Sequence, residues 1–252
     1  MDQPLYKELR DLALQLARAL PRPAFYTEHA SHLRRAEDSL GGHEFILRCR
    51  TYLDESLLEC AHGLCHCEAV ARDAGTIVLI ETEQSNMGSP ARERLLTASI
   101  VAGLLHDIKR KEQDHAVRGS IEAEKILSKL GMDLCERQYI ADAIRNHEAF
   151  QETFERDDTA GQLVSDALYD ADKFRWGPEN FTTTLWLMVE SHNTPPESLH
   201  RTFKEKMKGI ERIKETFRTE TGKRFGPEFI DQGIVIGNAI YDKMSAMLER
   251  SR

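Results

Sequence analysis

Residues 59–70, ECAHGLCHCEAV, place three cysteines and two histidines within eight consecutive positions. Thiolates and imidazoles are ligands of transition metals, and paired thiols also serve redox chemistry. Cys65, His66 and Cys67 are consecutive, so on a helix they point about 100° apart and cannot converge with a fourth ligand on one ion. We therefore interpret His66 as a ligand shared with distant helices and the cysteines as small packing residues. Two interpretations remain for His62, one turn before His66. It either contacts a metal ligand or donates a proton near the metal, or it is an exposed histidine where the helix begins.

Further metal-capable side chains lie on apolar helix faces later in the chain. His106 follows the small residues Ala102 and Gly103 by four and three positions, so it faces a side where another helix can approach closely. His147 and Asp172 lie on the apolar stripes of two later segments. One such histidine is usually a hydrogen-bonded core residue, but a buried carboxylate needs a partner, and a shared cation satisfies the whole set.

The spacing of apolar residues predicts helices nearly everywhere, including residues 76–80, TIVLI, whose flanks continue the helical pattern. Pro21 and Pro23 end the first helix, and Ser89 is the expected N-cap of the helix that leads to His106. Beyond residues 193–198, NTPPES, we predict a charged helix to about Arg218 and a last helix from Pro227. The expected class is all-α, as a single domain over residues 1–252.

Composition limits the function classes. The 252 residues carry 34 Lys and Arg against 42 Asp and Glu, a formal net charge of -8, which disfavours nucleic acid as a partner. The bases between residues 201 and 224 alternate with acids and indicate a solvated helix face rather than an RNA groove. No signal peptide or membrane span is apparent, so we expect a cytoplasmic protein with reduced cysteines, among which Cys49 and Cys135 are expected to be buried. The sequence leaves open whether the chain forms a homodimer.

The order of these residues resembles the HD superfamily of metal-dependent phosphohydrolases over residues 44–192. The matching segments are HCEAV with His66, AGLLHDI with His106 and Asp107, and LYDADKF with Asp172. His115 in HAVRG and His147 in IRNHE match the fuller pattern of members with two metals. The resemblance implies an HD-domain helical bundle over residues 44–192, with additional N-terminal helices and a C-terminal helical extension over residues 197–252.

The resemblance also implies a reaction. His66, His106, Asp107 and Asp172 would hold a first divalent ion, and His115 and His147 would either hold a second or donate hydrogen bonds to substrate phosphate. Such a mixed shell suits Mn, Fe, Co, Ni or Zn, and Mg remains possible. A metal-bound hydroxide would attack the phosphorus of a small phosphoester or nucleotide.

The turn after the His-Asp pair carries two bases that are expected to act on the substrate. Arg110 and Lys109 would neutralise charge on the phosphoryl oxygens, or else form a solvated basic turn without a role in the reaction. Many family members read His-Asp-Ile-Gly-Lys where this chain reads HDIKR. The Gly-Tyr-Pro extension of cyclic-di-GMP phosphodiesterases is missing, and the Glu-Asp pair of alarmone hydrolases is not clearly present, so neither specialised activity is favoured. The alternatives are a diiron oxygenase on the same scaffold and a non-catalytic HD-like sensor or binding module.

Overall fold

The computed structural model describes residues 4–53 and 63–250, and every regular element in them is helical. The expected all-α class is confirmed. The helices are α1 (Pro4–Ala19), α2 (Ala24–Glu28), α3 (Ala30–Gly42), α4 (Glu44–Arg50), α5 (Leu64–Gln84), α6 (Ser89–Leu105), α7 (His115–Lys129), α8 (Leu134–Arg145), α9 (Thr159–Phe174), α10 (Leu185–Ser191), α11 (Pro196–Arg212) and α12 (Glu220–Arg250). A short π-helix η2 (Asn180–Thr184) precedes α10, and a 3-10 turn η3 (Ile213–Glu215) follows α11.

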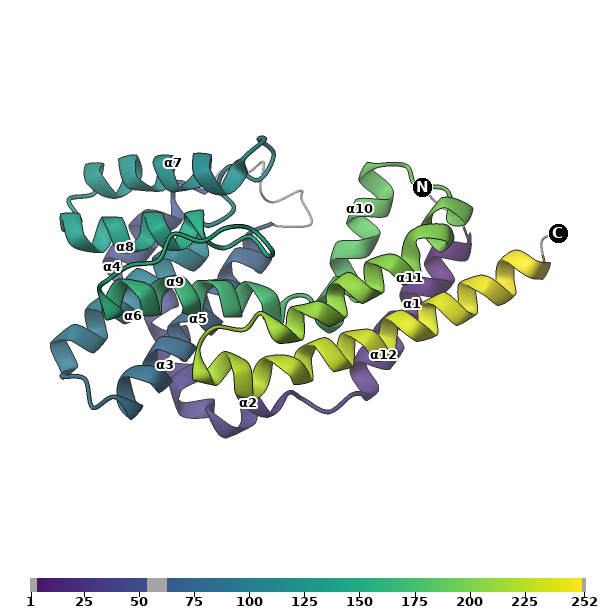
Figure 1. Ribbon diagram of the computed structural model, residues 1–252, viewed down its shortest axis with the longest axis horizontal. Helices are drawn as coiled ribbons and strands as arrows, with labels where there is room; N and C mark the ends of the chain where they lie inside the picture. Colours follow the sequence, from purple (N-terminus) through teal and green to yellow (C-terminus); the bar gives the residue numbers. More distant parts are fainter. Residues whose placement is uncertain (1–3, 54–62, 251–252) are drawn as a thin grey trace.

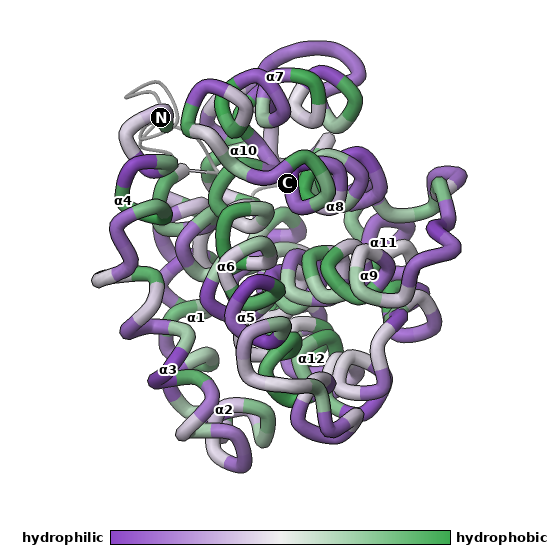
Figure 2. The backbone as a smooth tube through the Cα atoms, turned by 90° about the vertical axis from the view of Figure 1, so that its left-hand side faces the viewer, coloured by the Kyte–Doolittle hydropathy of each residue, from purple (hydrophilic) through white to green (hydrophobic). Residues whose placement is uncertain are grey.

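Helices α3 to α9 form the left-hand body in Figure 1, and α5, α6, α8 and α9 pack against one another inside it. The TIVLI stretch lies within α5 with all five side chains buried, as the helical pattern predicted. Figure 2 shows the hydrophobic stretches of α6 near the middle of the molecule, whereas α3 and α7 carry hydrophilic residues on its outside. No helix in the described part of the chain has the length and apolar character needed to span a membrane.

Helices α5 and α6, which carry or lead to His66 and His106, approach each other closely. A Cβ atom built on Gly103 would lie 2.4 Å from the Cα of Ala71, so only glycine allows this contact. The expectation that the Gly103 face meets another helix is therefore confirmed. The expected N-cap of α6 is wrong by one residue: Gly88 is the N-cap and Ser89 is already helical, with a proline in the first turn.

The C-terminal helix begins earlier than its proline suggests. The carboxylate of Asp170 on α9 accepts hydrogen bonds from the backbone N–H groups of Arg218 and Thr219, at 2.9 and 2.8 Å, and from the Thr219 hydroxyl at 2.7 Å. Thr219, held in this way, accepts the backbone N–H of Gly222 at 2.8 Å, and Glu81 on α5 accepts that of Thr221 at 2.8 Å. Donors in the first turn of α12 are thus satisfied, so the helix begins at Glu220 and Pro227 lies inside it. The expected helix start at Pro227 is wrong for this reason, and the expected charged helix up to Arg218 ends at Arg212.

The N-terminal helix and the C-terminal extension pack on each other. Helix α1 lies along α12, and the Tyr6 hydroxyl donates to the carbonyl of Thr194 at 2.6 Å. The extension joins the left-hand body through buried aromatic rings, with Phe229 stacked on Phe174 at 4.3 Å between ring centroids. Phe217 and Phe225 are buried in the same contact region. In Figure 1, α10, α11 and α12 therefore form one arm that extends to the right with α1.

Candidate metal centre

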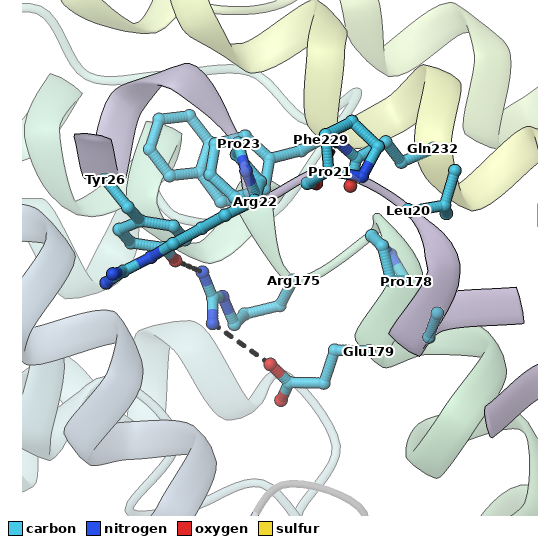
Figure 3. A pocket seen from close by; sticks show the side chains of 12 residues that line it. Leu20, Pro21, Arg22, Pro23, Tyr26, Arg175, Pro178, Glu179, Phe229 and Gln232 are labelled. Atoms are coloured by element: carbon cyan, nitrogen blue, oxygen red, sulfur yellow. Dashed lines mark hydrogen bonds and ion pairs between the residues drawn. The ribbon is translucent and has the colours of Figure 1, made fainter. Parts of the chain in front are cut away.

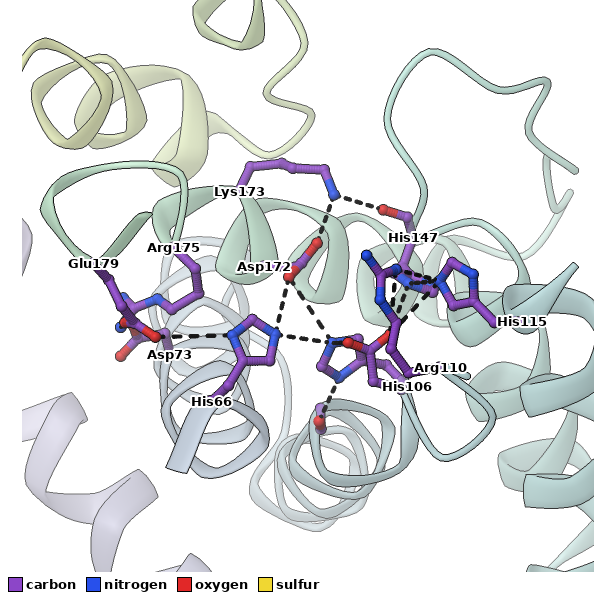
Figure 4. Close-up of polar contacts among 12 residues, drawn as sticks. His66, Asp73, His106, Arg110, His115, His147, Asp172, Lys173, Arg175 and Glu179 are labelled. Atoms are coloured by element: carbon purple, nitrogen blue, oxygen red, sulfur yellow. Dashed lines mark hydrogen bonds and ion pairs between the residues drawn. The ribbon is translucent and has the colours of Figure 1, made fainter. Parts of the chain in front are cut away.

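Five segments bring all six predicted ligand residues together (Figure 4). His66 lies in the first turn of α5, and His106 and Asp107 directly follow α6. His115 begins α7, His147 follows α8 and Asp172 lies near the end of α9. His62 lies outside the described residues.

A first set of ligand atoms forms around two imidazoles. The Nε2 atoms of His66 and His106 are 3.3 Å apart. Oδ1 of Asp172 lies 3.4 Å from the Nε2 of His66, and Oδ2 of Asp107 lies 3.5 Å from the Nε2 of His106. Ligands about 2.0–2.2 Å from one shared ion are separated by roughly 3–4 Å, so the atoms of His66, His106 and Asp107 fit a single transition-metal ion. Oδ1 of Asp172 lies beside both histidines, 3.9 Å from the Nε2 of His106, but does not belong to that group of three.

A second set uses the other oxygen of Asp107. Oδ1 of Asp107 lies 3.6 Å from the Nε2 of His115 and 3.6 Å from the Nε2 of His147. The two imidazole nitrogens are 3.3 Å apart. Asp107 thus belongs to both groups of potential metal ligands through different oxygens.

The outer nitrogens of the histidines face oxygen acceptors. Nδ1 of His106 lies 2.8 Å from the carbonyl of Gly103, and Nδ1 of His147 lies 2.6 Å from that of Ile144. A carbonyl only accepts, so we assign the ring proton of both histidines to Nδ1, which leaves the Nε2 lone pair facing inward.

Carboxylates face the Nδ1 atoms of the other two histidines, His66 and His115. Nδ1 of His66 lies 3.9 Å from Oε1 of Glu179, and Nδ1 of His115 lies 3.7 Å from Oε1 of Glu148. Partners of this kind orient a metal-bound imidazole and increase its basicity.

The chemistry of the ligand atoms indicates whether a metal ion fits this site. Inward lone pairs on neighbouring imidazoles repel each other unless a proton or cation lies between them. Asp107 and Asp172 are only 1% and 7% exposed, and buried carboxylates require compensating positive charge. A shared divalent ion supplies that charge, and imidazole with carboxylate favours Mn, Fe, Co, Ni or Zn over Ca. The residues therefore fit a buried metal centre.

Lys173 is a site residue that the sequence reasoning missed. Its buried ammonium donates to Oδ2 of Asp172 at 2.5 Å and to the carbonyl of His147 at 2.8 Å. Burial opposes ionisation of Asp172, but Lys173 and the neighbouring histidines outweigh it and hold the pKa of this carboxyl well below its usual value. Lys173 occupies one oxygen and leaves Oδ1 for the first set. The sequence signal that could have identified Lys173 is its position directly after Asp172 in LYDADKF.

The histidines of the site differ in their proton affinity without metal. Burial opposes protonation of His66, but the carboxylates of Asp172, Glu179 and Asp107 raise its pKa to about 9. Burial lowers the pKa of His106 to about 4 despite its neighbouring carboxylates. Burial and the charge of Arg110 lower the pKa of His115.

A cavity of about 440 Å³ opens above the ligand sets. The body side contributes His66, Asp107, His147 and Asp172, and the arm side contributes Met188, Lys206 and Ile210, among other residues. Trp176 lines the cavity, whereas Trp186 is buried and donates its indole N–H to the carbonyl of Phe181 at 2.6 Å. The arm therefore completes a cavity whose floor comes from residues 44–192.

The two bases after the His-Asp pair have different surroundings. Arg110 lines the cavity, and its Nη1 lies 2.7 Å from the Nε2 of His115. Lys109 is not among the cavity residues, and its ammonium pairs with Glu112 at 3.1 Å. The structure thus brings Arg110, but not Lys109, to the site.

A buried ionic network lies behind His66. Arg175 donates to Glu179 at 3.0 Å through Nη1, and to Asp73 at 2.6 Å and the Tyr26 hydroxyl at 2.7 Å through Nη2. Asp73 is fully buried on α5, two turns after His66. Arg175, Glu179 and Tyr26 also line a separate cavity of about 370 Å³ on the other side of this network (Figure 3). The sequence reasoning missed these residues because their pairing joins α2, α5 and the segment after α9.

Glu179→Gln should weaken the first metal site. Because the amide lacks the negative charge that faces the His66 ring, we expect a tenfold to hundredfold loss of affinity for the first ion, the usual effect of changing a ligand's outer partner. Glu148→Gln is the matched control, because Glu148 faces His115 of the second set. Calorimetric titration of both variants checks this, and equal losses at the first site would contradict the assignment.

The cysteines divide into buried and exposed thiols. Cys49 and Cys67 are buried, whereas Cys65 and Cys135 are exposed. The expected burial of Cys135 is wrong, because it lies in the first turn of α8 on the surface. The interpretation of the cysteines in residues 59–70 as packing residues holds for Cys67 but is wrong for Cys65, which faces solvent in the first turn of α5. Among the described residues, neither group of potential metal ligands contains a cysteine. Cys60 lies outside the described residues.

Cysteine alkylation should follow this division. Burial raises the pKa of the Cys49 thiol to about 12 and also raises that of Cys67, so both lack reactive thiolate. With N-ethylmaleimide at pH 7.5, we expect rapid modification of Cys65 and Cys135, and modification of Cys49 and Cys67 only in denaturant. Peptide mass spectrometry reads each position, and fast labelling of Cys67 in the folded protein would disagree with the structure.

Comparison of the chain with models of protein families, with curated proteins and with solved structures found no match.

Proposed function

We propose that this protein is a metal-dependent phosphohydrolase of the HD superfamily that acts on a small phosphoester or nucleotide. The observation that carries the proposal is the position of Asp107, whose two oxygens face two sets of inward-pointing imidazoles at the base of one cavity. The order of the motifs that contain these residues supports the same family. Manganese, iron, cobalt, nickel or zinc fits the donor set.

A bound divalent ion supplies Lewis acidity and lowers the pKa of water toward neutrality. The chain contributes the remaining parts of the mechanism. Arg110 and Lys206 on the cavity wall offer positive charge to phosphoryl oxygens. Trp176, Met188 and Ile210 offer an apolar surface to the rest of the substrate. Lys173 keeps one oxygen of Asp172 occupied and so fixes the direction of the other.

A substrate screen tests this function. Protein stripped of metal and reloaded separately with Mn²⁺, Fe²⁺, Co²⁺, Ni²⁺, Zn²⁺ or Mg²⁺ is incubated with nucleoside mono-, di- and triphosphates, cyclic nucleotides and simple phosphomonoesters. We expect at least one loaded form to hydrolyse a phosphoester bond and to lose this activity on chelation. Hydrolysis that is equally fast in the stripped protein, or none in any form, would rule the proposal out and leave a binding module.

The membership of Asp107 in both ligand sets also favours a second candidate, a diiron oxygenase. In such an enzyme His66 and His106 would hold one iron, His115 and His147 would hold the other, and Asp107 would contribute an oxygen to each. Isolation without oxygen, followed by iron analysis and Mössbauer spectroscopy, discriminates between the two functions. An oxygenase requires two bound irons that react with oxygen, whereas a protein that takes up no iron is not one.

A further inference from the structure

The Arg110 side chain lies against the second set of ligand atoms. Its Nη1 is 2.7 Å from the Nε2 of His115 and 3.9 Å from Oδ1 of Asp107 (Figure 4). The guanidinium therefore contacts two of the residues that would bind a second ion. It also lines the cavity, and 36% of its side chain is exposed, so there is space into which it can turn.

The Nε2 atom of His115 can bind only one partner at a time. Because Nδ1 faces the carboxylate of Glu148 at 3.7 Å, Nε2 is the nitrogen that accepts the Arg110 hydrogen bond. An imidazole nitrogen has a single lone pair in the ring plane, so it accepts either an N–H group or a metal. An arginine does not lose its proton in proteins, so only a movement of Arg110 can free the nitrogen.

We propose that Arg110 is an internal cation that occupies the second metal site and that a second divalent ion must displace it. The displaced guanidinium then turns into the cavity, where it binds a tetrahedral oxyanion. This inference rests on the proposed function, because it assumes the metal centre described above. The second ion and the anion favour the same position of Arg110, so each raises the affinity for the other.

Calorimetric titration of metal-free protein with Mn²⁺, with and without sulfate, tests the proposal. The unaltered protein should bind one ion tightly and a second weakly, and sulfate should tighten the second. In Arg110→Ala, the second ion should bind tenfold to hundredfold more tightly, the range expected when one charge-assisted hydrogen bond no longer competes. The response to sulfate should disappear in the same variant.

Arg118→Ala is the matched control for charge. Arg118 lies one turn after His115 on α7 and pairs with Glu112 at 3.2 Å, so this variant removes the same charge without touching the ligand atoms. It should retain the weak second site and its response to sulfate. A similar tightening in both variants would mean a general charge effect and would overturn the proposal, as would an Arg110→Ala protein that binds no second ion more tightly.

Nitrogen NMR of His115 provides a direct readout. The Nε2 resonance should move in Arg110→Ala without metal, because the atom loses its hydrogen bond, and an unchanged resonance would contradict the contact. Neither measurement includes a substrate. Failure of the phosphohydrolase screen therefore leaves this result standing, whereas an active enzyme with an unaltered second site would refute only the role of Arg110.

Discussion

Replacing Asp107 with alanine should remove metal from both ligand sets at once. The carboxylate faces His106 through Oδ2, and His115 and His147 through Oδ1, so within the described part of the chain it is the side chain that both sets share. We expect the variant to retain less than one ion per chain. Hydrolysis should fall at least about a thousandfold, since a metal supplies several kcal/mol to the transition state and each 1.4 kcal/mol is about tenfold in rate. Elemental analysis of the dialysed protein and phosphate release measure the two effects.

Two variants separate this role from a general loss of structure. Asp107→Asn keeps the shape of the side chain but not its charge, and it should lose metal almost as completely while circular dichroism stays helical. His115→Ala removes a ligand of the second set alone, so it should keep the first ion. If Asp107→Asn retained two ions, the carboxylate would not be the shared ligand.

Replacing Gly103 with alanine should destabilise the fold strongly. The added Cβ would meet the backbone of Ala71 at 2.4 Å, and a backbone cannot turn aside as a side chain can. We expect about 3 kcal/mol of destabilisation, at the upper end for overpacked cores, and a fall in Tm of roughly 6–12 °C. The carbonyl of Gly103 orients His106, so metal affinity should fall as well. Thermal unfolding with and without metal measures both.

Gly209→Ala is the matched control for this substitution. Gly209 lies inside α11, and nothing lies within 4 Å of a Cβ built there. Alanine reduces the conformational freedom of the unfolded chain, so this variant should gain up to about 1 kcal/mol. A Gly103→Ala protein as stable as Gly209→Ala would show that α5 and α6 can separate at little cost.

The sequence by itself determined the helical class and the apolar faces on which His106, His147 and Asp172 lie. Both follow from local spacing, because a residue three or four positions from buried residues shares their face. His106 behind Gly103, and Asp172 on the stripe of α9, are placed correctly by this rule alone. Convergence of the six ligand residues could be anticipated only from the order of the motifs that contain them.

The tertiary structure decided what depends on contacts between distant segments. Helix α12 begins at Glu220 because Thr219, held by Asp170 from 49 positions away, and Glu81, 140 positions away, accept its first N–H groups. No window around Pro227 contains those partners. Arg110 reaches His115 while Lys109 reaches Glu112, because the turn after α6 directs consecutive side chains to different sides. Lys206 lines the cavity although it lies beyond the segment that resembles the family, since packing of the arm on the body brings α11 over the site. Local periodicity fixes which side of a helix is buried, but only packing fixes which partner a buried charge meets there.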